Sequence, residues 1–218
     1  MSNIHSIIIP EETLEEWQQL ADILTWLLGS PIALINRYCE TAIETQISSS
    51  NPENPFNRGA QFPLDGVYCG EVIKSRKKLI VKNALKDEAW KDTFEAEAGL
   101  LSYLGYPIYL PGGALFGTIC VVDRKEHEYN EMQQKVVERF KYMVESHMQL
   151  LFKNEELERR LSEIKTLRSL LPICSNCKKV RDDEGYWSQI DNYILKHTGT
   201  EFSHGICPDC MKKLYPDY

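Results

Sequence analysis

The stretch SYLGYPIYLPGGALFGTICVVD, residues 102–123, decides the fold of the larger part of this chain. Two runs rich in apolar residues, 102–110 and 114–123, are separated by Pro111, Gly112 and Gly113. Aromatic and β-branched residues favour strands, and a short break rich in glycine and proline favours a reversal of the chain. The stretch therefore predicts a β-hairpin.

The segments on either side of this hairpin carry both helical and extended patterns. Apolar residues at three- and four-residue spacing predict an amphipathic helix over 11–28, which Gly29 would end. Further strands are predicted at 32–38, 41–47 and 79–81, helices at 66–74 and 88–97, and a long loop at 48–58. Because the strands come in pairs instead of alternating with helices, we expect an α+β fold with an antiparallel sheet flanked by helices.

Several of these segments resemble a GAF domain, and the resemblance covers most of residues 10–150. YCGEVI at 68–73 and LIVKNA at 79–84 are similar to the family's helix and following strand, and 102–123 is similar to its central hairpin. The resemblance implies a PAS-like sheet with a pocket for a small-molecule ligand on one face. The NKFDE-type residues of cyclic-nucleotide-binding members and the cysteine context of bilin-binding members are absent from the sequence.

The family's pocket position predicts which residues contact a ligand. Polar or aromatic residues on the corresponding sheet and helix segments give six candidates: Arg37, Tyr68, Cys69, Tyr103, Tyr109 and Cys120. Cys69 and Cys120 lie on apolar segments, where a buried thiol acting as a small hydrophobic group is the alternative. The sequence does not identify the ligand, and a GAF domain that only dimerises is a further alternative.

Two cysteine pairs near the C-terminus, CSNC at 174–177 and CPDC at 207–210, predict a metal site. Residues 169–218 are too few to bury a self-sufficient core, and four thiolates on two tight turns close a tetrahedral shell. We predict structural zinc held by Cys174, Cys177, Cys207 and Cys210. Iron as in rubredoxin, pairs of redox thiols, and His204 as a ligand remain alternatives; Lys178 and Met211 replace the glycines that a rubredoxin site favours.

The amino-acid sequence of this tail is also similar to that of a known module. Segments 170–174, 177–187 and 202–210 resemble a cysteine-rich C-terminal module that follows GAF, PAS or receiver domains in bacterial signalling proteins. Within it, a helix is predicted at 187–196 beside a small apolar cluster. The resemblance does not supply a biochemical role, and we expect the module to present a surface to a protein partner.

A heptad pattern joins the two parts of the chain. Leu150, Leu157, Ile164 and Leu171 occupy d positions, and His147, Asn154, Leu161 and Arg168 occupy a positions, in a helix that starts near Val136. A buried Asn at an a position fixes the register of a parallel coil, so a parallel homodimer is predicted. The alternative, one amphipathic helix packed on the sheet, suits the part before Leu150. The predicted domains are 1–149, a coiled-coil linker at 150–168, and 169–218.

The composition and the absence of common catalytic motifs narrow the classes of function that the chain can have. A net charge of −7 disfavours binding to the phosphate backbone of nucleic acids. No apolar run is long enough to cross a membrane, and residues 1–10 do not read as a secretory signal. A cytoplasmic location is therefore expected. GxSxG, HExxH and Walker motifs are absent, and the histidines do not cluster near carboxylates in the sequence. We predict a non-catalytic signal-transduction sensor of a small ligand or of redox state. The alternative is a thiol redox enzyme such as the GAF-type free methionine sulfoxide reductases, using Cys39, Cys69 and Cys120.

Overall fold

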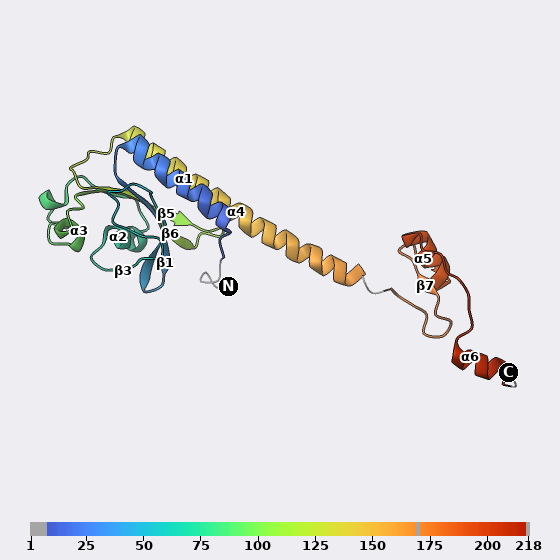
Figure 1. Ribbon diagram of the computed structural model, residues 1–218. Coiled ribbons are helices and arrows are strands. Elements are labelled where there is room, and N and C mark those ends of the chain that lie inside the picture. The colour runs from blue at the N-terminus through green and yellow to red at the C-terminus, as the bar shows by residue number, and fades with distance from the viewer. Residues whose placement is uncertain (1–7, 169–170, 217–218) are drawn as a thin grey trace. The chain divides into compact units, whose positions relative to one another are not determined.

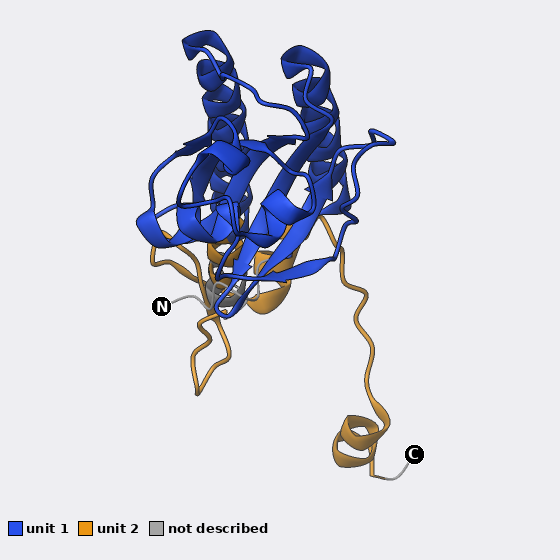
Figure 2. Ribbon diagram, turned by 90° about the vertical axis from the view of Figure 1, so that its left-hand side faces the viewer, with its two compact units in different colours: residues 1–155 blue, residues 156–218 orange. Residues whose placement is uncertain are grey.

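The computed structural model describes residues 8–168 and 171–216, and the chain divides into two compact units. Figure 2 colours these units, residues 1–155 and residues 156–218, separately. The boundary falls inside the long helix α4 (Glu131–Arg168), as does the predicted boundary at residue 149.

A six-stranded antiparallel sheet forms the centre of the first unit, in the order β3-β2-β1-β6-β5-β4. The strands are β1 (Ile32–Cys39), β2 (Ala42–Ser48), β3 (Gln61–Pro63), β4 (Leu79–Val81), β5 (Ser102–Tyr109) and β6 (Leu115–Asp123). The predicted hairpin is confirmed as the β5–β6 pair, whose register runs from Ser102 opposite Asp123 to Tyr109 opposite Leu115. The expected α+β fold is confirmed with it.

Helices cover both faces of this sheet. Helix α1 (Glu11–Leu28) and the first part of α4 lie side by side over one face, where Trp17 packs edge-on against Phe116 with ring centroids 6.1 Å apart (Figure 1). Helices α2 (Tyr68–Ser75) and α3 (Phe94–Glu97) lie over the other face. Since successive side chains of a strand alternate between faces, both sets of strand residues are buried. This double cover explains why the strands read as nearly continuous apolar runs.

One predicted helix in this unit was wrong, and one strand was missed. The predicted helix 88–97 is mostly turns: a 3-10 turn η2 (Ala84–Lys86) precedes it and only α3 is helical, because the Asn83 and Asp87 side chains accept backbone hydrogen bonds from Leu85 and Ala89. Short polar side chains that bond their own backbone favour turns. Strand β3 was not predicted, because it lies after the long loop and pairs over only three residues.

Helix α4 begins at Glu131, five residues before the predicted start. Asn130 and Gln133 explain this start by a reciprocal capping arrangement: the Gln133 backbone N–H donates to Asn130 Oδ1, and the Asn130 N–H donates to Gln133 Oε1, each at 3.0 Å. The helix then buries Val137, Val144 and Met148 against the sheet. The prediction of an amphipathic helix on the sheet before Leu150 agrees with this packing.

In the described part of the second unit, residues 171–216, four short elements follow the helix. They are β7 (Val180–Arg181), β8 (Trp187–Ser188), α5 (Ile190–Thr198) and α6 (Pro208–Leu214). The predicted helix at 187–196 starts three residues later, because Trp187 pairs with Arg181 in the β7–β8 hairpin. Val180 is the only buried residue among those described after residue 156.

None of the helices in the described ranges is both long enough and apolar enough to span a bilayer.

Candidate ligand cavity and cysteine knuckles

A cavity of about 50 Å³ lies between the sheet and the α2 and α3 side of the first unit. Strands β1 and β6 contribute to its floor through Asn36 and Cys120, and α2 contributes Cys69. Most of its lining is apolar or aromatic, including Leu34, Phe56, Phe62, Tyr68, Phe94 and Tyr103. Phe94 is exposed although it lines the cavity, so the cavity reaches solvent beside α3. A volume of this size holds a few water molecules or a small organic group.

Four of the six predicted ligand-binding residues line this cavity: Tyr68, Cys69, Tyr103 and Cys120. The other two lie elsewhere. Arg37 directly follows Asn36 on β1, so strand alternation directs it away from the cavity face. Tyr109 packs with Ile73 and Leu115 farther along β5, and its hydroxyl donates to the Arg76 carbonyl at 3.1 Å. Ligand binding by any of these residues stays a prediction.

Two thiols meet in the wall of the cavity. Cys69 Sγ lies 3.6 Å from Cys120 Sγ and 3.3 Å from the Tyr103 hydroxyl, and Asn36 Nδ2 donates to Cys69 Sγ at 3.4 Å. The hydrogen bond with Cys120, aided by those from Tyr103 and Asn36, lowers the pKa of Cys69 to about 7 despite burial. The same pairing with Cys69 raises the pKa of Cys120, followed by burial. Cys69 is therefore the thiol of this pair that forms a thiolate at neutral pH.

The sequence did not single out two further polar residues of the cavity, Asn36 and Glu95. Both are buried, and Glu95 Oε1 accepts a hydrogen bond from the Tyr68 backbone N–H at 2.7 Å. Asn36 Oδ1 and Glu95 Oε2 have no hydrogen-bond partner among residues 8–168 and 171–216. A lone Asn inside the apolar run IALIN was a signal for the first, whereas Glu95 carried no signal because the charged segment around it reads as surface.

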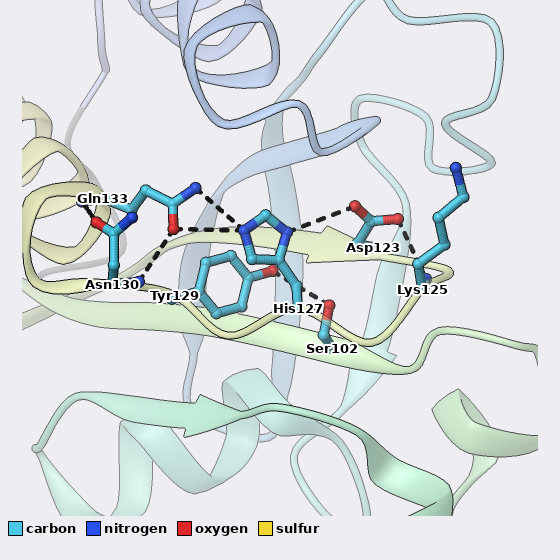
Figure 3. Close-up of polar contacts among 7 residues, drawn as sticks. All are labelled: Ser102, Asp123, Lys125, His127, Tyr129, Asn130 and Gln133. Atoms are coloured by element: carbon cyan, nitrogen blue, oxygen red, sulfur yellow. Dashed lines mark hydrogen bonds and ion pairs between the residues drawn. The ribbon is translucent and has the colours of Figure 1, made fainter.

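A second polar cluster surrounds His127 at the connection between β6 and α4 (Figure 3). His127 Nδ1 lies 3.8 Å from Asp123 Oδ2, and its ring stacks on Tyr129 with centroids 4.3 Å apart. The sequence analysis found no clustering of histidines near carboxylates and passed over the four-residue spacing of Asp123 and His127, which brings the two side chains together. The Ser102 hydroxyl contacts the Tyr129 hydroxyl at 3.4 Å. These contacts hold the connection that leads into α4, and none of these residues lines the cavity.

The first cysteine pair of the second unit lies in a tight hairpin. The Lys178 N–H donates to the Cys174 carbonyl at 3.0 Å, the Cys174 N–H donates to the Lys179 carbonyl at 2.8 Å, and Lys178 has a φ of 59°. Lys178 thus adopts the left-handed conformation for which the sequence argument expected glycine, whereas Met211, at the corresponding place of the second pair, lies within helix α6 (Pro208–Leu214). The Cys177 and Asn176 backbone N–H groups point to the Cys174 sulfur and lower its pKa.

The second pair begins a helix. Cys207 is the N-cap residue of α6, and Cys210 lies in its first turn. The backbone N–H of Cys210 is the main cause of a lowered pKa at Cys207. Each pair therefore presents two thiols on one turn, and the turn favours the thiolate of its first cysteine, Cys174 or Cys207. Thiolates are the donors that zinc requires. Across residues 8–168 and 171–216, no three His, Cys, Asp or Glu side chains come together as a ligand set. The four-cysteine zinc site and the role of His204 stay predictions.

Comparison with known proteins decides the family of the first unit. A family model described as the GAF domain matches residues 14–141, more than half of the chain. The chain belongs to the GAF domain family. The GAF resemblance read from the sequence is thereby confirmed, and the matched residues do not include the cysteine-rich tail. No curated protein sequence matches significantly.

Solved structures agree on the fold of the GAF unit. The GAF domain of an Acinetobacter phosphoenolpyruvate-protein phosphotransferase is 14% identical, with a TM-score of 0.53 over 69% of this chain and 88% of its own. The GAF domain of a Bacillus halodurans two-component sensor histidine kinase is 13% identical, with a TM-score of 0.52 over 69% and 99%. The free methionine-R-sulfoxide reductase of Neisseria meningitidis, bound to its substrate, is 11% identical, with a TM-score of 0.52 over 62% and 77%. At these identities the likeness shows the fold alone.

Proposed function

We propose that this chain is a cytoplasmic, non-catalytic signal-transduction protein. Its GAF cavity senses a small molecule, α4 relays the change through a parallel homodimer, and a zinc-bound cysteine module presents a surface to a protein partner. A ligand drives such a relay only by binding two conformations unequally. The signalling role is common among the structural neighbours, which include a sensor histidine kinase and a methyl-accepting chemotaxis protein.

One observation carries the sensing part of this proposal. Two residues that line the cavity, Asn36 and Glu95, each hold a buried oxygen, Oδ1 and Oε2, that has no hydrogen-bond partner among residues 8–168 and 171–216. Buried polar groups are normally paired, so polar residues left partly unpaired in the wall of an apolar cavity favour a binding role for it. The cavity volume of about 50 Å³ favours a small ligand.

The relay part rests on the two halves of α4. The first half buries Val137, Val144 and Met148 on the GAF sheet, whereas the predicted seam residues Leu150, Leu157 and Leu161 are more than half exposed. A row of exposed leucines at heptad spacing favours pairing with the same helix of a second copy. The side chains of Ile164 and Arg168 lie outside the described part of the chain.

Light scattering coupled to size-exclusion chromatography tests the relay. The chain has a mass of 25.2 kDa, and we expect a particle of twice that mass at micromolar concentration. A monomer under these conditions would remove the coiled-coil relay from the proposal. Ligand binding in the GAF cavity would then have to change the activity of a partner without a coiled coil.

A thiol redox enzyme is the second candidate, and the 3.6 Å approach of Cys69 and Cys120 favours it. A sulfoxide would be reduced to a sulfide while the two thiols form a disulfide, and its oxygen would leave as water with the two thiol protons. Cys39, the third candidate cysteine, lies beside Glu44 and does not line the cavity. A coupled NADPH and thioredoxin assay with free methionine sulfoxide tests this function: turnover that is lost in Cys69→Ser supports it, and no turnover removes it.

A further inference from the structure

Cys69 and Cys120 place two thiols side by side in the wall of the GAF cavity, with their sulfurs 3.6 Å apart. Cys69 is the second residue of α2, and Cys120 lies within β6, so the pair connects the helix that covers the sheet to the sheet itself. The sulfurs of a disulfide lie ~2.05 Å apart. An approach of about 1.6 Å would therefore bring these two sulfurs to bonding distance.

The two thiols differ in their access to solvent. Cys69 is partly exposed, whereas Cys120 is fully buried. The cavity that both residues line reaches solvent beside the exposed ring of Phe94. Its volume of about 50 Å³ holds a few water molecules, and therefore also a molecule built on two oxygen atoms. A small oxidant that enters from solvent meets Cys69 before Cys120.

Hydrogen-bond donors surround the sulfur of Cys69. The Tyr103 hydroxyl lies 3.3 Å from this sulfur, and Asn36 Nδ2 donates to it at 3.4 Å. Both side chains are buried. Hydrogen bonds of this kind, with that from Cys120 first, lower the pKa of Cys69 to about 7. A thiolate that solvent reaches and that lies next to a second thiol is the usual arrangement of a cysteine that responds to oxidants.

Cys39 supplies an internal contrast within the same unit. Its sulfur lies 3.7 Å from Glu44 Oε2, and it does not line the cavity. Burial and the charge of Glu44 raise the pKa of Cys39. Cys39 should therefore remain a thiol at neutral pH and react slowly with oxidants.

We propose that Cys69 and Cys120 form an oxidation site for hydrogen peroxide and other small hydroperoxides, and that oxidation bonds α2 to β6 through a disulfide. The inference rests on the proposed sensing function, since it names the chemical class of the signal. It differs from the reductase alternative in its oxidant, which is a peroxide instead of a sulfoxide, and in its product, which is a lasting cross-link instead of an intermediate in turnover.

The reaction has two steps. The Cys69 thiolate attacks one oxygen of the peroxide: an S–O bond forms, the O–O bond breaks, and the other oxygen leaves as hydroxide, which takes up a proton to become water. The Cys120 sulfur then attacks the sulfur of the Cys69 sulfenic acid. The S–S bond forms, the S–O bond breaks, and the hydroxyl group leaves as water with the Cys120 proton. The two thiols lose two electrons, and the peroxide gains them.

Peptide mass spectrometry of the full chain tests the inference. The reduced chain is treated with hydrogen peroxide at pH 7, and samples taken over time are alkylated in denaturant and digested with trypsin. Cleavage after Arg58, Lys74, Lys91 and Arg124 releases Cys69 in residues 59–74 and Cys120 in residues 92–124, each with one cysteine. We expect these two peptides to become linked and to separate again with dithiothreitol. Cys69 should be lost about 10-fold or more faster than Cys39. Oxidation of Cys39 while Cys69 and Cys120 stay reduced would overturn the inference.

Variants separate the roles of the two thiols. Cys120→Ser should stop at the sulfenic acid, so Cys69 should be labelled by dimedone, whereas Cys69→Ser should give neither the link nor a label at Cys120. Cys39→Ser is the matched control and should form the link as the wild type does. Tyr103→Phe, which removes one donor to the Cys69 sulfur, should slow the first step about 3–10-fold. A dimedone label at Cys120 in Cys69→Ser would contradict the assigned order.

The same samples distinguish this inference from the proposed function. A dimer by light scattering whose Cys69 and Cys120 resist peroxide leaves the signalling proposal standing and removes only this signal. A monomer that forms the link keeps the oxidation site and removes the relay.

Discussion

The GAF unit and the cysteine-rich unit are built on different sources of stability. The GAF unit buries side chains on both faces of a six-stranded sheet, including Trp17, Tyr103 and Phe116. Among the described residues after 156, only Val180 is buried, and Trp187, Phe202 and Tyr215 are about half exposed. Apolar burial at about 25 cal/mol per Å² therefore stabilises the first unit but supplies little to the second. A segment of this kind needs a cross-link such as a metal.

The largest effect on the GAF unit is expected from its helix α1. Trp17→Ala should lower the free energy of unfolding by about 3–5 kcal/mol, because Trp17 is fully buried against Phe116. Trp26→Ala on the same helix should change it by less than about 0.5 kcal/mol, since Trp26 is 81% exposed. Urea unfolding followed by circular dichroism measures both. Similar losses at the two positions would mean that burial does not stabilise this unit.

A glycine in each unit sharpens the contrast between tight and open packing. A Cβ added at Gly117 of β6 would lie 1.8 Å from the Asn36 carbonyl oxygen, so Gly117→Ala should destabilise the GAF unit by about 1–3 kcal/mol or more. A Cβ at Gly205 of the second unit meets no atom within 4 Å, so Gly205→Ala should leave unfolding unchanged. The unfolding midpoints of the two variants give the comparison. A stable Gly117→Ala protein would require the β1–β6 pairing to be looser than described.

The helix between the units should show an effect on association instead of folding. Leu157→Ala should weaken the proposed homodimer by roughly 10–100-fold, because each copy would lose one leucine from the proposed seam. Sedimentation equilibrium measures this, and Glu158→Ala is the control on the neighbouring exposed position. The unfolding midpoint of the GAF unit should stay the same in both. An unchanged dimer in Leu157→Ala would place the dimer contact elsewhere.

The smallest expected effect concerns the thiols of the GAF unit. Cys69 should react with iodoacetamide with a half-maximal rate near pH 7, because its pKa is lowered to about 7 and only the thiolate reacts. The rate should fall about tenfold per pH unit below that value. The pKa of Cys39 is raised by burial, so its rate should rise only at higher pH. Mass spectrometry of labelled peptides separates the two cysteines, and identical profiles would contradict the shift at Cys69.

The sequence predicted the fold where the pattern was local and repeated. The 102–123 hairpin followed from two apolar runs around Pro-Gly-Gly, and α1 followed from its spacing. Asn130 and Gln133 form a capping pair that indicates the early start of α4. The apolar pattern, which begins only at Val136, predicted a later start. In the segment 88–97, bonds from short polar side chains to the backbone outweighed a helical pattern.

The candidate site was only half predictable, because it depends on contacts between distant segments. Tyr68, Cys69, Tyr103 and Cys120 were found from the family's pocket position. Glu95 was not, since nothing local indicates that α3 turns this carboxylate onto the N-terminus of α2. Arg37 was selected for its polarity, although the neighbouring Asn36 is the side chain that lines the cavity. The positions of the two cysteine pairs were readable, whereas their assembly into one metal site stays a prediction.

Metal content tests the contrast between the two units most directly. The full chain is purified without added metal and compared with the Cys174→Ser, Cys207→Ser double variant by inductively coupled plasma mass spectrometry, with hydrogen exchange over 171–216 as a second readout. The account predicts about one zinc per chain, lost in the variant together with protection of the tail, while the unfolding midpoint of the GAF unit stays unchanged. Four freely titrating thiols on a metal-free tail that is still protected from exchange would contradict it.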